Sequence, residues 1–134
     1  MAAGKVWDPG TEAFVDVTNN GDVYDVAVTV TDAYAGVDDQ VDSYVLVLGD
    51  AGKAVTVNKA SATTLTVPAN ADVAFDIDTH IDVVALGAGQ VTVAGDAGVT
   101  VRATPGLKLR AQYSHALLIK LATNTWVLAG DITA

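Results

Sequence analysis

The sequence predicts a single all-β domain, built as an antiparallel β-sandwich or a jelly-roll-like barrel. Short apolar runs, many alternating apolar with polar residues, recur about every eight to twelve positions between residues 63 and 131. Turn-forming stretches separate them, among them Pro68-Ala69-Asn70 and Gly87-Ala88-Gly89. The composition agrees, because the chain has 22 valines, and 15 of its 16 acids are aspartate, a poor helix former.

The chain opens with a predicted arm, residues 1–12, ahead of a β domain over residues 13–134. Trp7 follows Lys5 in this arm, and Pro9-Gly10 forms a turn behind it. A tryptophan near a chain end either packs back on its own domain or anchors the arm on a neighbour, since tryptophan is enriched at interface hot spots. Both readings stay open, and we take Trp7 and Lys5 as candidate partner-binding residues.

The β domain begins with a predicted hairpin. Residues 13–18 and 23–31 alternate apolar and polar side chains, as half-buried strands do. Asn19-Asn20-Gly21-Asp22 lies between them, and Asn-Gly tolerates the positive φ that a type I′ turn requires.

Residues 32–43 predict a surface loop, because they hold four aspartates and no base. Calcium binding there is an alternative, although the spacing does not fit an EF-hand. The continuous apolar run 44–48 predicts a strand buried on both faces. A turn at 49–52 and a strand at 54–58 follow.

The remaining strands are predicted wherever an apolar or alternating run lies between two turn signals. These runs cover residues 64–68, 73–75, 81–84, 90–93, 99–102, 107–110, 117–120 and 125–128.

The charge is unevenly distributed. Residues 1–50 hold ten acids and one base, whereas residues 51–134 hold six of each, which accounts for the net charge of −9. This balance argues against nucleic-acid binding, which needs clustered lysine and arginine. The acidic half is either a solvated face or a surface that meets a basic neighbour. The sequence contains no run of 18 apolar residues, so it predicts no membrane span. It also contains no cysteine, so it predicts neither disulfides nor thiolate chemistry.

One polar cluster, from Asp76 to Asp82 and including His80, raises the question of a metal site. On a continuous strand its carboxylates and imidazole would share a face and could bind a divalent ion. Because aspartate is a poor strand former, the sequence favours a turn at 78–80 instead. The pair Ser114-His115 is not a catalytic arrangement, since a nucleophile and its base meet in space rather than as neighbours. We therefore predict no catalytic residue, metal or cofactor.

The densest basic group is formed by Arg102, Lys108, Arg110 and Lys120, at polar positions of successive predicted strands. These residues are either scattered over the solvent face or form one basic stripe. A stripe could face the acidic residues 1–50 of an adjacent subunit and drive a closed ring, for which we expect a trimer. Arg102, Lys108 and Arg110 join the candidate partner-binding residues.

Residues 60–131 resemble a known β module. The resemblance rests on Gly87-Ala88-Gly89-Gln90-Val91-Thr92-Val93, on Leu107-Lys108-Leu109-Arg110-Ala111-Gln112-Tyr113-Ser114, and on Trp126-Val127-Leu128-Ala129-Gly130-Asp131. Together these elements are similar to the C-terminal module of tailed-bacteriophage tail fibres and minor tail proteins, and to small head-decoration proteins. The resemblance implies a structural role in the virion and no catalysis.

These observations lead to an expected function. We expect a capsid decoration (cement) protein on the outside of a phage head, assembled in the host bacterial cytoplasm, with the major capsid protein or another virion protein as its partner. No coiled-coil or collagen-like repeat provides the stalk of a fibre. The alternatives are a tail-fibre tip or minor tail protein that contacts the host surface, and an enzyme that depolymerises host glycan.

Overall fold

A computed structural model describes residues 36–134. The chain divides into two units at residues 34 and 35, and the described residues belong to the second unit. The predicted arm at 1–12 and the predicted hairpin at 13–31 therefore lie outside the described residues.

The described unit is all-β, as predicted, with one short 3₁₀ turn, η1 (Leu48–Asp50). In chain order its strands are β2 (Val37–Gln40), β3 (Tyr44–Val45), β4 (Ala54–Val57), β5 (Thr63–Val67), β6 (His80–Ala85), β7 (Val91–Gly95), β8 (Thr100–Ala103), β9 (Lys108–Leu109), β10 (His115–Ala122), β11 (Thr125–Gly130) and β12 (Ile132–Thr133).

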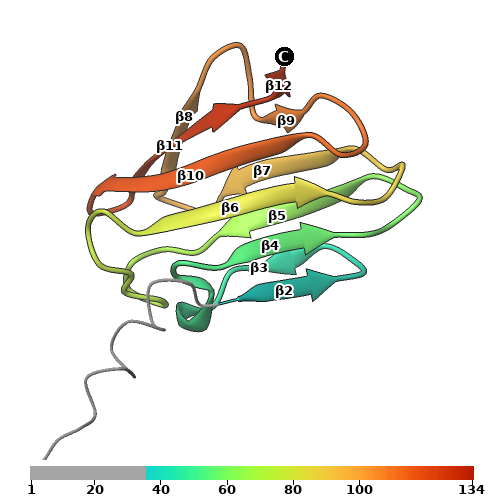
Figure 1. Cartoon of the computed structure of the whole chain (residues 1–134). Helices are drawn as coiled ribbons and strands as arrows, with labels where there is room; N and C mark the ends of the chain where they lie inside the picture. Colours follow the sequence, from blue (N-terminus) through green and yellow to red (C-terminus); the bar gives the residue numbers. More distant parts are fainter. Residues whose placement is uncertain (1–35) are drawn as a thin grey trace, which may run out of the picture. The chain divides into compact units, whose positions relative to one another are not determined.

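Successive strands alternate between two sheets. One sheet has six strands in the order β2-β4-β6-β10-β11-β8, and the other has five in the order β12-β9-β7-β5-β3. From β2 to β9 the chain crosses from one sheet to the other at every step, and only the β10–β11 hairpin stays within a single sheet. Figure 1 shows β2 and β3 at one end of this unit and β8, β9 and β12 at the other.

The pairing direction differs from the predicted antiparallel sandwich. β2, β4 and β6 pair in parallel in one sheet, and β3, β5 and β7 do so in the other. The β8–β11 pair is parallel as well, whereas β6–β10, β10–β11, β7–β9 and β9–β12 are antiparallel. The prediction of a purely antiparallel architecture was wrong. From β2 to β7, each coil of chain lies on the previous one, as in a β-solenoid.

The core lies between the two sheets and is filled by the inward half of each alternating strand. In β5, Thr63, Leu65 and Val67 are buried while Thr64 is exposed, and β6 and β7 show the same period of two. The fully buried side chains are mainly Val and Leu with a single large aromatic, Trp126. Phe75 packs edge-on against Trp126, with ring centroids 5.5 Å apart. The core therefore depends on many small branched side chains, as the valine content predicted.

Three local predictions were wrong. Residues 37–40, inside the predicted surface loop, form the edge strand β2 against β4. The run 44–48 is a two-residue strand followed by η1, and in it only Leu46 is buried. Residues 73–75 form no strand, although Phe75 is buried. The other predicted strands from residue 54 onward, and the turn at 49–52, are present.

Gly89 permits the closest backbone contact between coils. Its N–H donates to the Lys59 carbonyl oxygen at 2.9 Å, and a Cβ at this position would lie 1.9 Å from the Ser61 carbonyl oxygen. Gly87 lies equally close to the backbone of Lys59. The Gly-Ala-Gly element thus lets one connection rest directly on the connection of the preceding coil.

We expect Gly89→Ala to destabilise the domain by about 1–3 kcal/mol, because the added methyl group must displace backbone rather than a flexible side chain. Thermal or urea unfolding of the purified protein measures the change. The matched control is Gly49→Ala, where an added Cβ meets nothing within 4 Å, and it should stay within about 0.5 kcal/mol of wild type. Equal stability of the two variants would contradict the close contact.

Candidate functional site

The five predicted partner-binding residues fall into two groups. Trp7 and Lys5 lie outside the described residues. Arg102 lies in β8 and Lys108 in β9, and Arg110 follows directly after β9. The structure therefore places the three described candidates on neighbouring segments at one end of the unit.

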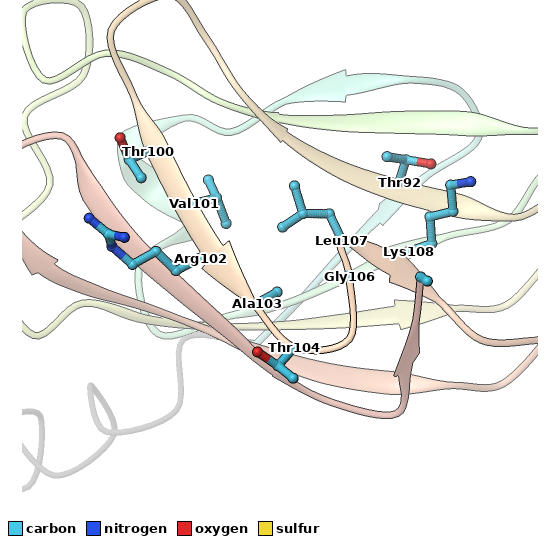
Figure 2. A pocket seen from close by; sticks show the side chains of 10 residues that line it. Thr92, Thr100, Val101, Arg102, Ala103, Thr104, Gly106, Leu107 and Lys108 are labelled. Carbon is cyan, nitrogen blue, oxygen red and sulfur yellow. The ribbon is translucent and has the colours of Figure 1, made fainter.

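A groove of about 750 Å³ opens between β8 and β9 (Figure 2). Its apolar surface comes from Val101, Ala103 and Leu107, which are half-buried and pack against the core. Arg102 and Lys108 also line it and are exposed, and neither has an ion-pair partner within residues 36–134. None of the described side chains that line the groove is acidic. The other lining residues are Thr92, Thr100, Thr104, Gly106 and Ala134.

The alternation of β8 produces this combination of apolar and basic surface. Val101 and Ala103 are in register with the buried Trp126 and Leu128 of β11, so they face the core. The side chain of Arg102, between them, points to the outer face of the sheet, away from the core. β8 ends its sheet, so no further strand covers its outer side among the described residues.

Arg110 is engaged within its own unit. Its Nε donates to Asp131 Oδ1 at 2.7 Å and its Nη2 donates to Oδ2 at 2.9 Å, while Ser114 Oγ donates to Oδ2 at 2.6 Å. Hydrogen bonds from Arg110 and then Ser114 hold the pKa of Asp131 below its ordinary value. This bidentate pair joins the segment after β9 to the segment between β11 and β12. The structural role of Arg110 accounts for its position without a partner protein.

Lys120 is buried, so it belongs neither to a basic stripe nor to a scatter of bases on the solvent face, and both predicted arrangements were wrong for this residue. It lies in β10 and is only 2% exposed. Its Nζ donates to Asn70 Oδ1 and to the Phe75 carbonyl oxygen, both at 2.6 Å. A buried ammonium group needs such acceptors to offset its desolvation. Lys120 therefore fixes the connection between β5 and β6 rather than a partner.

The polar cluster at 76–82 is a turn leading into β6. Asp78 has a positive φ of 75°, and His80 Nδ1 lies 2.7 Å from the Asp78 carbonyl oxygen. Asp82 instead contacts His115, with Oδ1 and Nε2 2.7 Å apart. Across residues 36–134 no group of three His, Cys, Asp or Glu side chains is placed to hold a metal ion.

A second cluster of acidic side chains, formed by Asp50 and Asp38 with Tyr44, was not identified from the sequence. Asp50 is buried, and its Oδ2 accepts from the Tyr44 hydroxyl at 2.8 Å and from the Val47 N–H at 2.9 Å. Burial raises the pKa of Asp50, while a hydrogen bond with Asp50 lowers the pKa of Asp38. Burial also raises the pKa of Tyr44. The only signal in the sequence is an aspartate at the end of an apolar run, and it is too common to be diagnostic.

Similarity to known proteins adds no functional assignment, and neither does a search for membrane-spanning helices. No protein-family model, curated protein or solved structure matches this chain. Within residues 36–134 no helix is both long and apolar enough to cross a bilayer. The groove beside β8 combines apolar side chains with two cations that have no ion-pair partner within residues 36–134. It is therefore the candidate site, and its chemistry is suited to binding.

The Arg110–Asp131 pair predicts a pH dependence. A carboxyl whose pKa is lower in the folded state than its ordinary value of 3.8 stabilises the fold above that value, and the stabilisation is lost as the pH falls through the lowered pKa. We therefore expect Asp131→Asn to be less stable than wild type at neutral pH and to lose less further stability on acidification. Unfolding followed between about pH 2 and 7 measures both effects.

The control is Asp72→Asn, which removes an exposed carboxylate that has no ion-pair partner within the described residues. It should behave as wild type. Parallel acid curves for wild type and Asp131→Asn would contradict the assigned role of Asp131.

Proposed function

We propose that this chain is a non-enzymatic structural protein of a bacteriophage virion, a capsid decoration protein on the outside of the head. Its partner is the major capsid protein or another virion protein, and it acts as a homo-oligomer, a trimer. It is assembled into particles in the host bacterial cytoplasm. No nucleic acid, membrane, metal or cofactor takes part in this proposal.

The observation that carries the proposal is the structural use of the residues behind the family resemblance. Gly87 and Gly89 permit close contact between coils. Arg110 and Ser114 bind Asp131, and Trp126 fills the core. Within the described residues these motif positions pack the core or hold loops in place, and they do not bring reactive side chains together. This use supports a module selected for a rigid scaffold, as a virion component requires.

The proposal extends to the fold. Strands that alternate between two sheets with parallel neighbours favour a short β-solenoid, with the β10–β11 hairpin inserted before its last strand β8, over a sandwich or barrel. Stacked coils suit an assembly role because each coil contacts only its neighbours, which leaves the two ends of the stack open to further contacts.

The alternative of a host-contacting tail-fibre tip has one supporting observation. Tyr113 is 71% exposed and has a positive φ of 70°, so the loop between β9 and β10 displays an aromatic ring. It is the only strongly exposed aromatic side chain within residues 36–134, since Trp126 is buried. A single ring gives weak support compared with an aromatic patch.

We expect Trp7→Ala, and deletion of residues 2–10, to abolish binding to phage particles that lack the protein. A buried tryptophan contributes ~2–4 kcal/mol at a hot spot, which is roughly 30- to 1,000-fold in affinity. Co-sedimentation with particles measures binding, and cryo-electron microscopy of the particles locates the bound protein. The melting temperature should stay near that of wild type.

The matched control is Tyr113→Ala, which should bind particles as wild type does. If Trp7→Ala unfolds the domain, the tryptophan belongs to a core and the arm is not the anchor. If wild-type protein is found on the tail, or binds only host cells through Tyr113, the decoration proposal is wrong and the tail-tip alternative takes its place.

A further inference from the structure

The two ends of the described unit match each other in strand length. The six-stranded sheet ends in β2 on one side and β8 on the other, and each has four residues. The five-stranded sheet ends in β3 and β12, and each has two residues. Both ends of both sheets are edges without a partner strand among the described residues.

The ends also match in direction. β2, β4 and β6 are parallel; β10 runs opposite to β6, β11 opposite to β10, and β8 runs with β11. β8 therefore points the same way as β2. In the other sheet β3, β5 and β7 are parallel, β9 reverses and β12 reverses again, so β12 points the same way as β3. A second copy placed end to end would continue both sheets as parallel ladders.

The backbone pattern selects a register for this contact. Gly36 and Gln40 direct their carbonyl oxygens to β4, so in a parallel ladder Val37 and Asp39 direct their backbone groups outward. The Thr100 N–H donates to the carbonyl oxygen of Asn124, beside β11, so the backbone N–H and C=O groups of Val101 and Ala103 point to the open edge of β8. These outward groups interlock when Val101 lies opposite Asp38 and Arg102 opposite Asp39.

The side chains fit the same register. Asp38 is paired with the buried Val55 and Val101 with the buried Trp126, so both face the core side of their sheet. Asp39 and Arg102 both lie on the outer side, which brings opposite charges together. The β2–β3 end also exposes apolar side chains that the groove beside β8 could cover, namely Val41, Val45, Val47 and Leu48.

We propose that two copies of this chain associate head to tail, the β2–β3 end of one copy docking on the β8–β12 end of the next, with β2 added to β8 and Asp39 paired with Arg102. This contact uses two different surfaces, so repetition gives a closed ring or an open stack. It deepens the proposed assembly role by naming its surfaces. It does not require that the protein decorates a head.

The first test is charge reversal in the full chain. Arg102→Asp and Asp39→Arg should each weaken self-association by about tenfold or more, because each places like charges in contact. The double variant with both changes, or a 1:1 mixture of the two single variants, should associate again. The control is Leu121→Asp with Thr123→Asp, which makes the same charge change as Arg102→Asp at exposed positions of the β10–β11 hairpin, on strands that are not sheet edges. Sedimentation velocity over a concentration series measures all of these.

The second test uses the absence of cysteine from the chain. Neighbouring strands lie about 4.8 Å apart, within the Cα separation that a disulfide spans. An equimolar mixture of Asp39→Cys and Arg102→Cys should form a disulfide-linked heterodimer on mild oxidation, while each variant alone should form little. Replacing Asp39→Cys with Val37→Cys, two residues out of register, should lower the yield several-fold.

A monomer at all concentrations without crosslinks overturns the proposal, and so do homodimers formed equally by each single-cysteine variant. The failure modes of the two proposals are separate. A protein that crosslinks head to tail but binds no particle contradicts only the decoration role. One that decorates particles without this crosslink contradicts only the head-to-tail contact.

Discussion

The architecture depends on a constraint of parallel pairing. Two parallel neighbours cannot be joined by a tight turn, so the chain must leave the sheet and return. Here it does so by crossing to the opposite sheet, and each crossing adds a strand there. β4, β5, β6 and β7 follow from this one rule, and the shared core of small branched side chains lies between the two sheets. The glycines at 87 and 89 permit the crossings to lie close together.

Two charged side chains, Lys120 and Asp131, hold connecting segments that the backbone hydrogen bonds between strands do not fix. Lys120, inside the unit, satisfies the carbonyl oxygen of Phe75 and the side chain of Asn70, and so holds the long connection that carries Phe75 to Trp126. Asp131, between β11 and β12, accepts hydrogen bonds from Arg110 and Ser114 and so holds the segment that follows β9. In both cases a charged side chain fixes the position of a loop through charge-assisted hydrogen bonds, and for the buried Lys120 these bonds also offset the loss of water.

The sequence was sufficient for most strands and insufficient for their pairing. Strands such as β5, β6 and β7 were predicted because alternation with a period of two is a local property of their residues. Parallel pairing is not local, since short strands between turns fit a sandwich and a solenoid equally well. β2 was missed because its ladder with β4, and not its Val-Asp-Asp-Gln composition, makes it a strand. Arg102 and Lys108, which the sequence offered as candidates, line the groove, and their role in binding stays a prediction. The burial of Lys120 could not be predicted, because it depends on a loop distant in sequence.

The position of the β10–β11 hairpin has a consequence for how the chain reaches this state during synthesis. β8 precedes the hairpin in sequence, yet it joins its sheet only through β11. A nascent chain can stack β2 to β7 as they emerge, but β8 must wait until residues 125–130 have left the ribosome. Until then its valine and alanine side chains lack the tryptophan and leucine that cover them. The last coil is therefore completed late, when the hairpin takes its place between β6 and the earlier-made strand β8.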